Sequence, residues 1–289
     1  MRGFLIFLLF LVFFLAVPLA ALSYSLNLAL KPEYIKESLI KSKIYEATAR
    51  TLPKLIESSN DEESPVSPED LKILEDFAKN EVTASYIQSK SEEMVDNTYN
   101  WVSGKTEKAP SISFIDLREK FKAETKAEVL PTELDQFLSK PLTIEVNKNG
   151  QGLRRTFQII RLAPLVLTAF SAMSLLAIFL LVSGWKSKIR DTSLALFMPA
   201  PIGLIVGGAI ICISNLLTGI VKSSLEKSPF EQLIEPLRNI ILTVANDVTK
   251  PIFIIFGIFL VVALTLFIIS FFVGNNPKIV EDTPQNTSV

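Results

Sequence analysis

The chain has 289 residues, of which 49% are hydrophobic, with a mean hydropathy of +0.38 and a formal net charge of −1. This composition suits a membrane protein with a polar part, and the charge gives no indication of nucleic-acid binding, which needs a basic face. The chain has no histidine, which excludes Ser-His-Asp triads and most transition-metal sites. A single cysteine, Cys212, excludes an internal disulfide.

The first apolar segment, Gly3–Leu22, follows a basic residue, Arg2. A positive start, a long apolar core and small residues near Ala20 are typical of a cleaved signal peptide. However, Pro18 lies close to that candidate cleavage site, and the apolar character continues to Leu30. We therefore expect residues 1–26 to form a transmembrane signal-anchor, with a cleaved signal peptide as the alternative.

Residues 27–160 form a polar segment with 19 basic and 23 acidic residues, long enough to bury its own core. Its apolar spacing predicts mainly helices, with a break near Lys41–Ser42 and helix starts at Ser67 and Asp116. Two alternating stretches, Ser111–Ile115 and Leu142–Val146, predict at most a short β-hairpin. We expect these residues to form a helical extracytoplasmic domain.

Two uncharged runs follow, Leu162–Val182 with 21 residues and Leu194–Leu217 with 24. About 20 apolar residues are enough for a helix to cross the hydrocarbon core of a bilayer. The runs therefore predict transmembrane helices over 161–183 and 194–218, joined by a charged loop over 184–193.

Residues 219–250 form a second polar segment, with a helix start at Ser228 and apolar residues at spacings of three and four up to Val248. We predict an extracytoplasmic amphipathic helix here. Its mixed charge favours packing on the polar domain over lying in the membrane interface. A fourth span over 251–273 and a short cytoplasmic tail over 274–289 complete the chain.

The predicted fold is therefore an all-α membrane protein with four transmembrane helices, a mainly helical extracytoplasmic domain and at most a short β-hairpin. Lys186, Lys188 and Arg190 crowd the 184–193 loop, and such basic density favours the cytoplasmic side. We expect a multi-pass protein of the cell membrane with both termini in the cytoplasm and the lipid bilayer as its surroundings.

No catalytic, cofactor-binding or metal-binding residue is predicted. Gly104-Lys105-Thr106 resembles the end of a phosphate-binding loop, but Tyr99 stands where that loop needs a glycine. Gly203 and Gly207, four residues apart in the third span, allow another helix to approach closely. They predict either packing within this chain or a seam between two copies in a homo-oligomer.

Several stretches of the polar segment resemble a family of uncharacterised four-pass bacterial membrane proteins. The resemblance rests on apolar spacing and turn residues in Pro32–Tyr45, Tyr86–Lys105 and Ile112–Leu117. It implies a bacterial envelope setting and no activity.

These observations favour a non-enzymatic envelope protein that binds or scaffolds a protein partner through its extracytoplasmic domain. The alternative is a subunit of a transport or export system. No span contains an ionisable group of the kind that pumps and transporters expose, which counts against that alternative.

Overall fold

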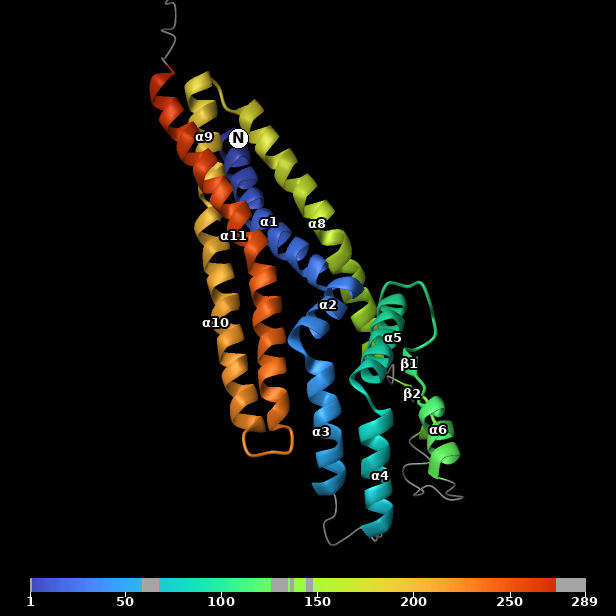
Figure 1. Cartoon of the computed structure of the whole chain (residues 1–289). Coiled ribbons are helices and arrows are strands. Elements are labelled where there is room, and N and C mark those ends of the chain that lie inside the picture. The colour runs from blue at the N-terminus through green and yellow to red at the C-terminus, as the bar shows by residue number, and fades with distance from the viewer. Residues whose placement is uncertain (1, 59–67, 126–134, 136–137, 144–147, 274–289) are drawn as a thin grey trace, which may run out of the picture.

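The computed structural model describes residues 2–58, 68–125, 135, 138–143 and 148–273. Nearly all of these residues are helical, and the two strands among them have two residues each. Long helices form a bundle, and shorter helices gather beside one end of it (Figure 1). The all-α prediction with only a minimal β-hairpin is confirmed.

Four helical segments of the described chain are long and apolar enough to cross a membrane, as predicted. Their helices are α1 (Arg2–Ala29), α8 (Lys148–Leu181), α9 (Trp185–Phe197) continuing into α10 (Pro199–Leu225), and α11 (Ile234–Phe272). Met198, between α9 and α10, has helical angles of φ −58° and ψ −44°, so these two helices run on almost without a break.

The prediction of a loop over 184–193 is wrong in one respect, because residues 185–193 are helical. Only residues 182–184 separate α8 from α9, and Gly184 has a φ of +83°, a value that lets the chain reverse there. The charged residues belong to the first turns of α9, whose Ser193 and Ala195 are buried. A helix satisfies its own backbone, so it can pass from the interface into the bilayer without interruption.

The boundary expected at Pro251 is also absent. The amphipathic segment and the fourth span form one helix, α11, with Pro251 in its interior. Its start is preceded by a short 3₁₀ helix, η1 (Glu231–Leu233), and a turn in which the Ser228 hydroxyl accepts a hydrogen bond from the Phe230 amide at 3.2 Å. Proline costs one backbone hydrogen bond inside a helix, and the packing of α11 on its neighbours outweighs that cost.

Helices α1 and α8 are antiparallel, and polar contacts mark both ends of the pair. At one end the Arg2 guanidinium donates to the Leu181 carbonyl, with 2.6 Å between Nε and O; at the other, the Asn27 amide donates to the Arg161 carbonyl at 3.4 Å. The 20 uncharged residues of α8 between these levels span about 30 Å, the thickness of the hydrocarbon core. We call the level of Arg2 the terminal edge and that of Asn27 and Arg161 the domain edge.

Helices α10 and α11 pack through the two glycines. A Cβ at Gly203 would lie 1.9 Å from Cδ2 of Phe256, and one at Gly207 would lie 2.7 Å from Cε1 of Phe253. The fully buried Phe256 therefore occupies the space that Gly203 leaves. Two roles were predicted for these glycines, and the structure shows the first one, helix packing within the chain. Phenylalanines of α11 occupy the surface over the glycines that a second copy would have to contact.

This packing sets the depth of α10. Ile255 of α11 and Tyr24 of α1 line one pocket, so Lys250, five residues before Ile255, lies near the level of Asn27 at the domain edge. The 22 residues from Pro251 to Phe272 cover about 33 Å. Because Gly207 lies level with Phe253, α10 passes the domain edge near Gly208 and continues for 17 residues, about 25 Å. We call residues 209–225 of α10 and 234–250 of α11 the arm.

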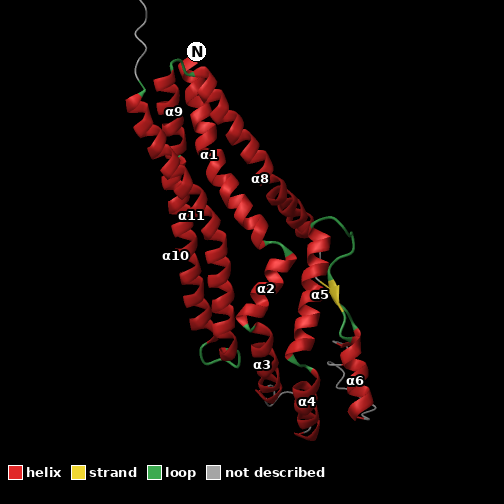
Figure 2. Ribbon diagram, turned by 45° about the horizontal axis from the view of Figure 1, so that its top comes forward, coloured by secondary structure: helices red, strands yellow, loops and turns green. Residues whose placement is uncertain are grey.

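The polar domain lies beside the arm, at the domain edge (Figures 1 and 2). Its elements are α2 (Pro32–Ser42), α3 (Ile44–Ser58), α4 (Pro68–Glu81), α5 (Ala84–Val102), β1 (Ser111–Ile112), α6 (Ile115–Thr125) and β2 (Leu142–Thr143). The predicted break after α2 is confirmed, with Lys43 in the left-handed region at φ 60°. The predicted strand pairing is also confirmed, because Ile112 lies opposite Leu142 in an antiparallel ladder.

Two predicted helix starts have different outcomes. Ser67 lies outside the described residues, as does the tail 274–289, although α4 begins at Pro68 directly after Ser67. Asp116 is not a cap, since α6 already begins at Ile115 and the Ser113 hydroxyl accepts the Ile115 amide at 3.4 Å.

The arm packs on the polar domain, which is the preferred one of the two expected positions for the amphipathic helix. Helix α11 contacts α2 and α3, and η1 contacts α3. The Tyr34 hydroxyl donates to Oδ2 of Asp247 at 2.9 Å across this contact. The polar domain also has a core of its own, in which Phe77 and Phe121 meet edge to face at 4.8 Å between ring centres.

Candidate functional site

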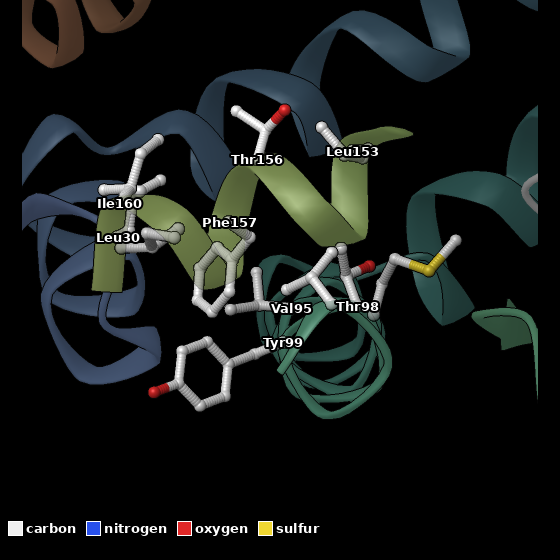
Figure 3. Close-up of a pocket in the computed structure, with 11 residues that line it drawn as sticks. Leu30, Val95, Thr98, Tyr99, Leu153, Thr156, Phe157 and Ile160 are labelled. Atoms are coloured by element: carbon white, nitrogen blue, oxygen red, sulfur yellow. The ribbon is translucent and has the colours of Figure 1, made fainter. Parts of the chain in front are cut away.

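One pocket of the described chain lies where α5 meets the outer turns of α8. Its volume is about 370 Å³. Figure 3 shows Phe157 of α8 facing Val95 and Tyr99 of α5, with Leu30 and Ile160 at one side. We call this space the edge pocket.

Helical periodicity explains why these side chains converge. The α8 residues that line the edge pocket are Leu153, Thr156, Phe157 and Ile160, and the α5 residues are Met94, Val95, Thr98, Tyr99 and Val102. Both sets follow spacings of three and four, which place side chains on one face of a helix. The Tyr99 and Phe157 rings meet at 5.6 Å with an interplanar angle of 89°, an edge-to-face contact that joins the two faces.

Three basic residues lie close to residues of the edge pocket. The Arg154 guanidinium lies against Gly104, where a Cβ would stand 2.9 Å from one of its nitrogens, and Gly104 has a φ of +83°. The Lys105 ammonium lies 5.5 Å from the centre of the Tyr99 ring. Arg161 completes this group one residue beyond Ile160, and its backbone carbonyl binds Asn27 at the domain edge.

A second pocket, of about 530 Å³, lies inside the polar domain. Its lining is almost entirely apolar and includes Phe77, Leu117 and Phe121 from the domain core. Met94 lines this domain pocket and the edge pocket alike, so one side chain separates the two spaces. The flexible thioether of methionine adapts readily to the shape of what it contacts.

A polar cluster lies at the wall of the domain pocket. Oδ1 of Asp116 accepts hydrogen bonds from the Tyr86 hydroxyl and the Lys90 ammonium, each at 3.2 Å. Lys90 also donates to the Ser113 carbonyl at 2.9 Å and lies 4.0 Å from Oε2 of Glu93. Burial, and then the negative charge of Asp116, raise the pKa of Tyr86 well above its usual range.

The cluster is better suited to holding the fold together than to acid–base catalysis. A catalytic acid pair needs two carboxyl groups that share a site, and here a lysine lies between Glu93 and Asp116. Both carboxylates are about half exposed, so water solvates their charges. The neutral Tyr86 hydroxyl donates to Asp116 rather than accepting a proton.

No catalytic, cofactor or metal residue was predicted, and within the described ranges no three His, Cys, Asp or Glu side chains come together in a way that could hold a metal ion. Sequence reasoning did miss the edge pocket. Its signal was present in the spacing from Leu153 to Ile160, but that stretch was assigned to the end of the polar segment, where it leads into the second span.

Comparison with protein-family models, with curated proteins and with solved structures finds no match for this chain.

Proposed function

We propose that this protein is a non-enzymatic membrane protein of the bacterial cell envelope that binds a partner protein through its polar domain and the adjoining arm. One observation carries the proposal. The arm exposes a stripe of large apolar side chains on α10, namely Ile213, Leu216, Leu217 and Ile220. Their exposed fractions run from 46% to 68%.

The stripe faces away from the rest of the chain. Its members lie within about 100° on one side of α10, and the buried Ser214 lies about 110° from the centre of that side. Soluble surfaces rarely keep a contiguous apolar patch uncovered, and such patches usually mark interaction sites. The stripe begins about 8 Å and ends about 18 Å beyond the domain edge, which puts it outside the reach of the hydrocarbon core.

These positions favour a protein as the occupant. The stripe has no charged member, so the partner would present an uncharged, apolar surface of its own. Charged side chains lie just beyond the stripe at the end of α10, where Lys222 and Glu226 are exposed. An apolar centre with a polar rim is the usual arrangement of a protein interface.

A photo-crosslinking residue at Leu216 tests the proposal in living cells. We expect one protein to be captured in high yield from Leu216. The same residue at Asn239, an exposed position on α11, should capture much less of it. Replacing Leu217 and Ile220 by serine should abolish the capture. Adducts with lipid alone, or with a second copy of this chain, would contradict the proposal.

The cytoplasmic location of both termini belongs to the same proposal. In a Cys212→Ser background, a cysteine at Asp76 should react with an impermeant thiol reagent in intact cells, and one at Ser187 should not. Asp76 is exposed and Ser187 is half-buried, so labelling of the cysteine at Ser187 after the membrane is permeabilised is the control that separates sidedness from burial. The reverse pattern would move the polar domain to the cytoplasm.

A transport or export subunit is the alternative, and the described spans give it little support. The pocket between α1, α8 and α11 has about 280 Å³ and is lined mainly by apolar residues such as Val17, Ile255 and Phe259. Its polar side chains are Tyr24, Thr168 and Ser171, and none of these carries a charge at neutral pH. A path for ions or protons usually contains an ionisable group.

A further inference from the structure

The edge pocket lies at the depth of lipid headgroups. Arg161 marks the domain edge, and the four α8 residues that line the pocket fall within the eight residues before it, from Leu153 to Ile160. Eight helical residues extend about 12 Å, which covers the polar interface that adds roughly 5–8 Å on each side of the hydrocarbon core. Leu30, directly after the end of α1 and three residues beyond Asn27, closes the pocket at the same level.

An apolar space at this depth is unusual. Water and headgroups surround a helix there, yet the edge pocket is lined by Leu30, Ile35, Val95 and Phe157 together with further apolar side chains. Its volume of about 370 Å³ lies within the range of small-molecule sites, roughly 300–1,000 Å³. The pocket is open and borders the spans, so the acyl chains of the bilayer are the nearest apolar molecules.

The charged residues of α8 beside the pocket are all basic. Arg154 and Arg161 lie three residues before and four residues after Phe157, so all three share a side of α8. Lys105 approaches from the end of α5. The chain contains no acidic residue between Glu145 and Asp191, so nothing on α8 neutralises these two arginines.

We propose that the edge pocket binds one acyl chain of an anionic phospholipid, with the phosphate held by Arg154 and Arg161. Guanidinium groups suit phosphate oxygens because they present paired donors in one plane. The acyl chain would lie between α5 and α8, where Tyr99 and Phe157 meet. This site is separate from the stripe on α10 and does not depend on a protein partner.

Tryptophan fluorescence gives a direct test, because the chain has two tryptophans at opposite edges. Trp101 precedes the pocket residue Val102, whereas Trp185 lies at the terminal edge and can be replaced by phenylalanine. The Trp185→Phe protein is placed in phosphatidylcholine vesicles with a minor fraction of phosphatidylglycerol, and bromine is carried by the acyl chains of one lipid or the other. At equal fractions, brominated phosphatidylglycerol should quench Trp101 more strongly than brominated phosphatidylcholine.

Arg155 supplies the matched control. It is exposed like Arg161 but lies about 160° around the helix from Phe157. Arg161→Gln should weaken the apparent affinity for brominated phosphatidylglycerol about fivefold, the effect of about one basic residue at a membrane surface, whereas Arg155→Gln should change it less than about twofold. Circular dichroism melting shows that both variants remain folded.

Three results would overturn the proposal. They are equal quenching by the two brominated lipids, no quenching by either lipid, and an equal loss in Arg161→Gln and Arg155→Gln. An excess of soluble glycerol phosphate should not displace the quenching lipid, because the acyl chain contributes to binding. Displacement would mean that the arginines bind a free phosphate and that the pocket plays no part.

Discussion

The two helix pairs of the bundle differ at the domain edge. Helices α1 and α8 meet polar partners at this level, where Asn27 binds the Arg161 carbonyl. Helices α10 and α11 cross the same level while still packed on one another and continue as the arm. The arm of α11 is covered by α10, α2 and α3, whereas the arm of α10 exposes its apolar stripe.

This difference shows what an apolar run can and cannot say about depth. The uncharged run in α8 begins directly after Arg161, and its length matches the thickness of the hydrocarbon core. Its position in the bilayer therefore follows from its own sequence. The run in α10 begins after Asp191 and meets no charge before Lys222, a stretch longer than the hydrocarbon core needs. Its depth is therefore set by Gly203 and Gly207, which fix it against α11, and not by its own composition.

The largest effect is expected where α10 and α11 are locked together. Gly203→Ala forces a Cβ into the Phe256 ring and should lower the free energy of unfolding by about 1–3 kcal/mol, as overpacking of a core usually does. Gly208→Ala is the control, since nothing lies within 4 Å of its Cβ, and it should be neutral or slightly stabilising. Denaturation in mild detergent, followed by far-ultraviolet circular dichroism, compares the two. Equal losses would contradict the packing register that sets the depth of the arm.

A smaller effect is expected where the arm meets the polar domain. Tyr34→Phe removes the hydrogen bond to Asp247 and should cost about 0.5–1.5 kcal/mol in the same assay. Tyr24→Phe, at an exposed position on α1, should cost less.

The same contact predicts a dependence on pH. Burial, and then the hydrogen bond to Asp247, raise the pKa of Tyr34 from 10.0 to about 12. Between these values the unfolded chain loses the tyrosine proton and the folded chain keeps it, so stability should fall as the pH rises. The fall between pH 10 and 12 should be shallower in Tyr34→Phe. An unchanged slope would show that the contact does not hold the arm to the domain.

The smallest effect on stability is expected at the stripe. The Leu216 side chain is 68% exposed, so Leu216→Ser should change the free energy of unfolding of the isolated protein by less than about 0.5 kcal/mol. Ile252→Ser, at a position only 1% exposed on α11, is the comparison and should be far more destabilising. If Leu216→Ser were equally costly, the stripe would be part of the core of this chain and not a surface for a partner.

The sequence was sufficient for the parts of the fold that depend on local spacing. It predicted four membrane-spanning helices, the break near Lys41–Ser42 and a short β-hairpin between the Ser111–Ile115 and Leu142–Val146 stretches. It failed where a tertiary contact decided the outcome, as at Pro251, where helix packing carried α11 past a residue that usually ends a helix. It also placed a loop at 184–193, since charge was used as a sign of an irregular segment.

The edge pocket was beyond the reach of sequence reasoning for a similar reason. The apolar faces of α5 and α8 are each visible from their spacing, but only the fold brings Tyr99 to Phe157, 58 positions later in the chain. No residue of the pocket belongs to a chemical motif. Its character comes from an apolar lining, nearby arginines and a depth that the antiparallel pairing of α1 and α8 defines.

The depth of α10 is the measurement that tests the account most directly. Gly219 lies on the arm with open space around it, and Val261 on α11 is 64% exposed within the bilayer. In Cys212→Ser protein reconstituted in lipid nanodiscs, Gly219→Cys should react readily with a water-soluble maleimide and Val261→Cys should not. Protection of both positions until detergent is added would place the stripe in the hydrocarbon core and contradict its role as a protein-binding surface.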